Sequence, residues 1–283
     1  MRTNAIVRIV LFSIAILVLL TILTVGIAAN QFMFHMDFGP NSTTSSTGSV
    51  DADPIRKISI EWTSGAITLR HADVDQIVFS ETEAVDAEPM VWLTAGDTLK
   101  ISCTKEETFF HIGVVPDKDL LIEAPRDWDC VELEIDTASA DVNVENMTIA
   151  RVDFDGASGD FDFLDCTVDT MEIDTASGDL NFCGSLNTLD CDGASADCDI
   201  RLSNCPNRIE MDLASGDLNL TLPEDCGFTA NLEALSGKLD TDFQVSHTNK
   251  GLVSGDGSCR IDMSAMSGNV FIHKATEPWN CDH

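Results

Sequence analysis

Positive charge is scarce in this sequence. Its 283 residues include 16 lysines and arginines against 48 aspartates and glutamates, which gives a formal net charge of −32 at pH 7. A field of this sign repels phosphate backbones, and it also repels anionic membrane surfaces and acidic wall polymers unless cations intervene. Nucleic acid is therefore excluded as a natural partner. An acidic shell also suits a soluble surface in high salt, so the charge alone names no partner.

Motifs for metal, phosphate or lipid attachment are missing as well. No CxxC motif with a partner pair is present, and the six histidines show no metal-ligand spacing. The "GDGS" stretch at Gly255 lacks the lysine and the helix context of a phosphate loop. No cysteine follows the apolar N-terminal run to accept a lipid, so a bacterial lipoprotein is not expected. We predict no catalytic, cofactor-binding or metal-binding residues.

One long apolar run lies near the start of the chain. Residues 9–29 carry no charge, and as a helix they would be about 31 Å long, close to the thickness of a bilayer core. Arg2 and Arg8 are the only charges before this run, and every acidic residue follows it. The positive-inside rule therefore places residues 1–8 in the cytoplasm and the rest outside. We predict a single-pass signal anchor in the cell membrane, with a cleaved signal peptide as the alternative.

The stretch after this run is polar. Residues 30–54 include "DFGPNSTTSSTGSVDADP", which is rich in serine, threonine and glycine and has little to bury. We predict a flexible linker here.

An internal repeat dominates the remainder of the sequence. The strings "TASA", "GASG", "TASG", "GASA" and "LASG" recur with their serines 19, 19, 18 and 20 residues apart. Looser copies follow at Ser236 and Ser267, and another lies upstream at Ser64. A period near twenty indicates a solenoid of stacked coils. The regular copies are centred on Ser139, Ser158, Ser177, Ser195 and Ser215.

Apolar and acidic residues alternate on both sides of each serine. Around Ser177, for example, Met171 and Ile173 precede the serine, and Leu180 and Phe182 follow it. This period of two predicts two strands per coil, each with one buried face. Small residues between the strands suit a sharp corner, either because glycine allows positive φ or because the corners pack closely.

These features predict an all-β fold, a parallel β-helix or β-solenoid with about 19–20 residues per coil, over residues 55–274. Each coil should add a shorter third segment before the next coil begins. The irregular strand-like pieces within residues 76–125 should be early coils or hairpins that cover the open end. Residues 246–258 should form a loop between late coils, and residues 275–283 a tail or cap with Trp279 as its apolar lid.

Stacking would place equivalent acids in columns about 4.8 Å apart. Such columns could collect Ca²⁺, or they could be a solvated face whose carboxylates accept hydrogen bonds from corner amides. We favour the second interpretation and expect only weak binding of divalent cations. The column three residues before the serine contains Asp136, Asp155, Asp174, Asp192, Asp212 and Glu233, and the column two residues after it contains Asp141, Asp160, Asp179, Asp197 and Asp217.

A further column, four residues after the serine, alternates between asparagine and aspartate. An amide beside each carboxylate can donate to it, so this column predicts a ladder of hydrogen bonds in place of repulsion. Its members are Asn143, Asp162, Asn181, Asp199, Asn219 and Asp240.

Ten cysteines in an exported chain invite disulfide bonds. Cys191 and Cys198 occupy inward apolar columns on either side of one corner, where they could be free or bridged. Cys166, Cys205 and Cys226 lie in connecting segments of different coils and could stack or pair.

The repeated motifs also carry a resemblance. "SGDFDF", "SGDLNF" and "SGDLNL", with the preceding "LLIEAP" and the N-terminal anchor, resemble a bacterial β-strand-repeat family of unknown function whose members are labelled as candidate adhesins. The resemblance covers about residues 55–274. It implies a right-handed parallel β-helix-like solenoid on an envelope protein, and it implies no catalytic residues.

We therefore expect a membrane-anchored, extracytoplasmic module for interaction, adhesion or envelope sensing, and not an enzyme. Its expected partners are the bilayer, through residues 9–29, and an unknown envelope protein or polysaccharide. The alternatives are a Ca²⁺-binding surface module and a polysaccharide-active β-helix enzyme. Such enzymes usually need cations near their acids, whereas the regular coils contain only Arg151, Arg201 and Arg208.

Overall fold

The computed structural model of the chain describes residue 38 and residues 41–82, 88–104, 117–249, 251–275 and 281. Regular secondary structure in these ranges consists of strands, which confirms the all-β prediction. Within them, no helix is long and apolar enough to cross a membrane. The predicted cytoplasmic segment at 1–8, the predicted span at 9–29 and the lid at Trp279 lie outside the described residues.

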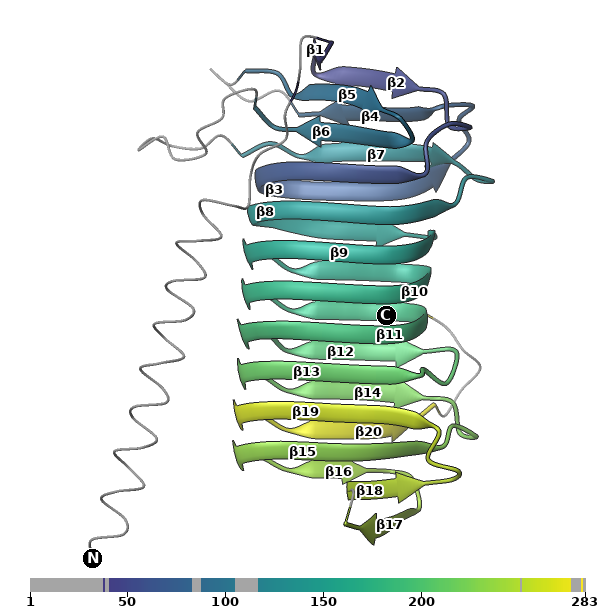
Figure 1. Ribbon diagram of the computed structural model, residues 1–283, viewed down its shortest axis with the longest axis vertical. Coiled ribbons are helices and arrows are strands. Elements are labelled where there is room, and N and C mark those ends of the chain that lie inside the picture. Colours follow the sequence, from purple (N-terminus) through teal and green to yellow (C-terminus); the bar gives the residue numbers. More distant parts are fainter. Residues whose placement is uncertain are drawn as a thin grey trace, which may run out of the picture. The chain divides into compact units, whose positions relative to one another are not determined.

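The described strands form one continuous sheet that is folded at the corners into two faces (Figure 1). The first face contains the strand before each corner serine, and the second face contains the strand after it. Neighbouring coils pair in parallel on both faces. The strands of the coils are β3 (Lys57–Ala72), β8 (Cys130–Glu145), β9 (Thr148–Ser158), β10 (Phe161–Ser177), β11 (Leu180–Ser195), β12 (Cys198–Leu202), β13 (Arg208–Ser215), β14 (Leu218–Leu222), β15 (Phe228–Ser236), β16 (Leu239–Thr241), β19 (Cys259–Ser267) and β20 (Val270–Lys274).

The register of these pairs matches the repeat seen in the sequence. Ser177 pairs with Ser158 on one side and with Ser195 on the other, and the upstream copy at Ser64 pairs with Ser139. Equivalent residues therefore stack in columns. The solenoid predicted from the period is confirmed.

The core lies between the two faces and is filled by alternate residues of most coil strands. The inward residues that meet across each corner are buried, and two of them, Phe154 and Phe161, pack edge to face with ring centroids 4.1 Å apart. Each such buried side chain contributes roughly 1.5–3 kcal/mol. The buried corner pairs are Ile135 with Val142, Phe154 with Phe161, Ile173 with Leu180, Cys191 with Cys198, and Met211 with Leu218.

The predicted third segment of each coil is not a separate strand. In β10 the chain runs from the second face of one coil into the first face of the next, with a register shift between Leu164 and Cys166. Asp165, between them, has a φ of 52°, and the equivalent Asn146 in the preceding coil has a φ of 55°. Asparagine and aspartate tolerate this left-handed conformation better than other residues do, apart from glycine. Each coil is therefore two-sided, with a second sharp corner seven residues after the serine.

The order of the coils departs from the order of the sequence at both ends. β3 pairs with β8, although β6 (Thr98–Ser102) and β7 (Leu120–Pro125) come between them in the chain and pair with the other side of β3. Near the C-terminus, β19 and β20 lie between the coil of β13 and β14 and the coil of β15 and β16. The columns listed from the sequence follow chain order, and the stack departs from that order at these two places.

Antiparallel strands cover the N-terminal end, as predicted for residues 76–125. β4 (Ile77–Glu81) pairs with β7, and β5 (Val91–Ala95) pairs with β6. Outside them lie β1 (Thr43–Thr44), paired with β5, and β2 (Thr47–Val50), paired with β4. Part of the predicted linker at 30–54 is therefore sheet. Gly48 has no side chain, and the ring of Phe79 takes up the space that a Cβ would need.

A hairpin covers the opposite end. β17 (Val245–Thr248) pairs with β18 (Gly251–Ser254), and β18 pairs antiparallel with β15 (Figure 1). The sequence predicted a loop between coils for this region. The hairpin instead supplies backbone hydrogen bonds to the exposed edge of the last coil, which would otherwise be left open for pairing with other chains.

Two disulfides link distant parts of the chain. Cys205 is bonded to Cys226, and Cys183 is bonded to Cys281. The other six cysteines are free and buried, including the corner pair Cys191 and Cys198. A hydrogen bond with Cys191, together with burial, raises the pKa of the Cys198 thiol. Burial raises the pKa of Cys166 to about 12, so a reactive thiolate does not form there at neutral pH.

Thiol counting should reproduce this arrangement. We expect an alkylating reagent to modify none of the six buried thiols in the native protein, six thiols in denaturant without reductant, and all ten after reduction. Mass spectrometry of the intact protein reads each count. Four modified thiols in unreduced, denatured protein would mean that a third disulfide exists, and eight would mean that one of the two is absent.

The corner glycines can be tested by adding one methyl group. A Cβ on Gly178 would lie 2.0 Å from the carbonyl oxygen of Gly159 in the neighbouring coil, and its φ is 151°. We expect Gly178→Ala to lower the free energy of unfolding by about 2–5 kcal/mol, from backbone strain and overpacking together. Chemical denaturation measures the loss.

Gly96→Ala is the matched control. Gly96 also has a positive φ, of 67°, but no atom of the described residues lies within 4 Å of the position of its Cβ. Gly96→Ala should lower the free energy of unfolding by about 1–2 kcal/mol, from the backbone conformation alone. Equal losses for the two variants would contradict the close approach of the corners.

Candidate functional site

The acidic column two residues after each serine is part of the corner itself. Each carboxylate in it accepts a hydrogen bond from the backbone N–H of the equivalent residue in the next coil. The N–H of Asp160 donates to Asp141 at 3.0 Å, and the N–H of Asp217 donates to Asp197 at 2.8 Å. The N–H of Asn269 continues the series by donating to Asp217 at 2.7 Å. The structural interpretation of this column is confirmed.

The column three residues before the serine behaves differently. Its carboxylates lie on the outer side of the first face. Partial burial and the neighbouring acids raise the pKa values of four of them, Asp136, Asp155, Asp174 and Asp192. The pKa of Asp136 rises to about 8 and that of Asp192 to about 6. The predicted column of six is interrupted, because Ser264 lies between Asp212 and Glu233 in the stack. In the described ranges, no three histidine, cysteine or acidic side chains come together in a way that could hold a metal ion.

The cations of the regular coils are each paired with an acid near by. Arg151 contacts Asp153 at 2.9 Å and Glu172 at 2.5 Å, and Arg208 forms an ion pair with Glu210. Arg201 lies 3.4 Å from Asp199. These pairs lie on separate coils, so the three cations predicted from the sequence do not converge on one group of acids.

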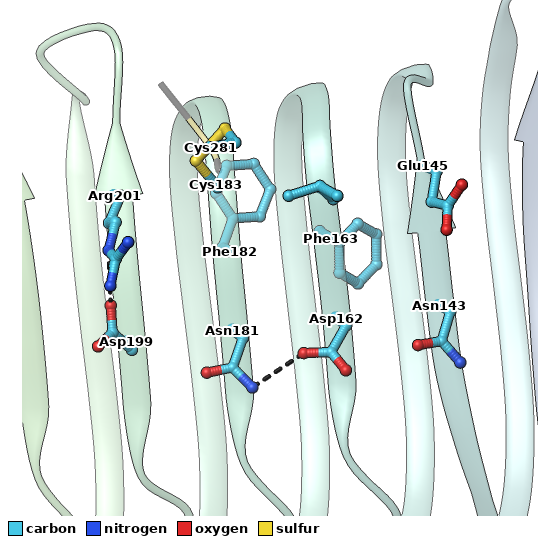
Figure 2. Close-up of a pocket in the computed structure, with 11 residues that line it drawn as sticks. Asn143, Glu145, Asp162, Phe163, Asn181, Phe182, Cys183, Asp199, Arg201 and Cys281 are labelled. Carbon is cyan, nitrogen blue, oxygen red and sulfur yellow. Dashed lines mark hydrogen bonds and ion pairs between the residues drawn. A yellow bond between two sulfur atoms is a disulfide. The ribbon is translucent and has the colours of Figure 1, made fainter. Parts of the chain in front are cut away.

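A pocket of about 290 Å³ lies on the outer side of the second face, over β8, β10, β11 and β12 (Figure 2). Two rows of side chains run across these four strands. One row is the asparagine and aspartate column, with Asn143, Asp162, Asn181 and Asp199. The other row lies two residues further along each strand, with Glu145, Leu164, Cys183 and Arg201.

The first row is only partly a hydrogen-bonded ladder. The side-chain amide of Asn181 donates to Asp162 at 2.9 Å, as predicted (Figure 2). Further along the stack, however, Phe271 of β20 lies between Asn219 and Asp240. The unbroken alternation read from the sequence is therefore wrong at this end, because the coil order differs from the chain order.

The disulfide between Cys183 and Cys281 forms one wall of the pocket (Figure 2). Cys281 comes from the far C-terminus, 98 residues away in the chain. The sequence analysis missed this residue as a site component. Cys183 occupies an outward column, which was the one available signal that its thiol faces away from the core.

The folded sheet and the stacked polar columns define a β-solenoid built from a repeated two-strand coil. The chain belongs to the Toastrack DUF4097 family, whose model matches residues 55–205 and, in an overlapping match, residues 119–273. This confirms the resemblance to a β-strand-repeat family that the motifs indicated. A comparison with curated proteins finds no match.

Similar proteins of known structure include examples from the bacterial genera Clostridium, Bacteroides and Parabacteroides. A candidate cell adhesion protein from Clostridium sporogenes has 9% identity and a TM-score of 0.39, over 83% of this chain and 100% of its own. A candidate adhesin from Bacteroides fragilis has 13% identity and a TM-score of 0.46, over 84% and 98%. A candidate lipid binding protein from Parabacteroides distasonis has 13% identity and a TM-score of 0.37, over 84% and 98%.

The raised pKa of Asp136 predicts how stability depends on pH. Because this pKa is about 8 in the folded chain and 3.8 ordinarily, the folded protein keeps a proton that the unfolded chain releases. The contribution of Asp136 to the free energy of unfolding therefore falls as the pH rises from about 4 to 8. We expect Asp136→Asn to raise the melting temperature at pH 8 by about 2–4 °C and to change it little at pH 4.

Asp141→Asn controls for the change of charge. The asparagine keeps an oxygen that can accept the Asp160 N–H, so the pH profile of its melting temperature should run parallel to that of the wild type. An Asp136→Asn profile that is also parallel to the wild type would contradict the raised pKa.

Proposed function

We propose that this protein is an extracytoplasmic interaction module, held at the cell membrane by residues 9–29, that acts in adhesion or envelope sensing without catalysing a reaction. The observation that carries this proposal is the arrangement of its polar groups. They follow the repeat in columns along the stack, and the pocket over β8 to β12 presents mixed donors and acceptors to solvent. A surface of this kind suits binding along an extended partner.

The two disulfides support an extracytoplasmic location. Disulfides persist in oxidising compartments such as the cell exterior and the periplasm, and they are rare in the cytosol. The order of charges around residues 9–29 supports the same orientation.

The enzyme alternative has less support from the site. General acid and base pairs need two groups held in mutual reach with distinct pKa values. Here the raised pKa values are spread along one column, from Asp136 to Asp192, and the cations of the regular coils are paired on separate coils. Turnover of a wall or plant polysaccharide by the purified full chain, abolished by removing one acidic cluster, would overturn the proposal.

The orientation can be tested with one new thiol. Asp256 lies in an exposed turn, so Asp256→Cys should react with a membrane-impermeant maleimide on intact spheroplasts. The wild-type chain is the control, because its six free cysteines are buried and should remain unlabelled. Labelling that appears only after lysis would place the domain in the cytoplasm.

The interaction role can be tested by capture from the envelope. We expect the tagged full chain, cross-linked in living cells, to retain an envelope protein or polysaccharide in a saturable manner. A tagged chain ending before residue 55 controls for capture through the N-terminal segment. Equal capture by the two chains would contradict a binding role for the solenoid.

A further inference from the structure

The pocket beside the Cys183–Cys281 disulfide differs from the rest of the second face. Much of the outer side of this face carries polar residues, with Phe271 as an exception, whereas here Leu164 and the disulfide line the pocket beside the row that contains Asp162 and Asn181. Figure 2 shows the disulfide beside that row. The pocket's volume of about 290 Å³ is close to the lower end of ligand pockets, about 300–1,000 Å³. Apolar surface combined with a few convergent polar groups is the usual composition of a small-molecule site.

We propose that this pocket binds a short neutral oligosaccharide, lying along the solenoid axis across β8, β10, β11 and β12. The proposal rests on the proposed function, because it names the ligand class for one site of an interaction module.

Charge excludes anionic ligands. The chain carries a formal net charge of −32, so a phosphate, sulfate or uronic acid would be repelled. Two of the pocket carboxylates already have a donor beside them, since Asn181 donates to Asp162 and Arg201 lies 3.4 Å from Asp199. Such partners lower the demand of these two carboxylates for an added cation. We therefore favour a neutral ligand, and a cation is the competing outcome of the test below.

The hydrogen-bonding groups of the pocket match hydroxyl groups. Asn143 and Glu145 have no side-chain hydrogen bond among the described residues, and Asn181 keeps a free amide hydrogen and its oxygen. The pocket therefore offers both donors and acceptors within a few ångströms. A hydroxyl donates one hydrogen bond and accepts others, so vicinal hydroxyls of a sugar can use both kinds of group at once.

The side chains of the pocket repeat from coil to coil, which suits an elongated ligand built from repeated units. Neighbouring strands lie about 4.8 Å apart, so an elongated ligand along the axis meets an asparagine or aspartate on each coil in turn. Leu164 is half-buried and offers apolar surface to the C–H face of a sugar ring beside the polar row, next to the largely buried disulfide. Strand pairing fixes the backbone beneath these groups, so little ordering cost is expected on binding.

Calorimetric titration of the full chain in detergent micelles tests the proposal. The probes are neutral trisaccharides of glucose, mannose and N-acetylglucosamine. We expect at least one to bind with a Kd of about 0.01–1 mM. Asp162→Ala should weaken this binding about tenfold, because it removes the acceptor and also releases Asn181.

Asp240→Ala is the matched control. It makes the same change in the same column, outside the pocket and beyond Phe271, and should leave the Kd unchanged. A second variant, Cys183→Ser combined with Cys281→Ser, removes the covalent wall and should weaken binding about three- to tenfold. The melting temperature of each variant shows that the fold is retained.

Three results would overturn the proposal. The first is that no trisaccharide binds below about 10 mM. The second is that Asp162→Ala and Asp240→Ala weaken binding equally. The third is that the polyamine spermidine binds in place of the sugars and depends on Asp162, which would make the pocket a cation site.

The experiments distinguish an error in the pocket proposal from an error in the proposed function. If the tagged chain still captures an envelope component and Asp162→Ala leaves that capture unchanged, only the pocket inference is wrong. If capture also fails, the interaction role itself is wrong.

Discussion

Close stacking of the corner backbones is the constraint on which the rest of this structure depends. At Gly178 the backbone passes so near the carbonyl oxygen of Gly159 that a single methyl group would collide with it. This contact allows only small residues at the corner, so that the strands on both sides of it can pair in register with those of the neighbouring coil. The columns, the buried corner pairs and the pocket rows all follow from that register.

A stacked, strongly acidic chain must also manage repulsion between like charges about 4.8 Å apart. The structure does so differently on each side of the corner. Carboxylates after the serine accept backbone N–H groups, so each negative charge is stabilised by the next coil. Four carboxylates before the serine, from Asp136 to Asp192, have raised pKa values, and Asp136 can hold a proton at neutral pH. Hydrogen bonding on one side and protonation of Asp136 on the other thus reduce the repulsion along this corner.

The local sequence pattern predicted most of the fold but only part of the candidate site. The period between Ser139 and Ser215 and the alternation around each serine predicted the coils and their buried faces, because both depend on neighbouring residues. The second corner, at Asn146 and Asp165, consists of residue types that accept positive φ, and this was a usable signal. The sequence pattern was instead interpreted as a third segment of each coil. The pairing of Cys183 with Cys281 was not predictable, because nothing local connects residues 98 positions apart.

The crossed order of strands at both ends has a consequence for how the chain acquires its structure during synthesis. β3 is the first coil strand to emerge, but its partner β8 follows only after more than fifty further residues have been made. The coil of β13 and β14 likewise pairs on one side with β19 and β20, which lie near the C-terminus. The coils at the two ends therefore cannot be added one at a time in the order of translation. The central coils, from β8 to β12, pair with one another in chain order, so these contacts can form as the chain emerges.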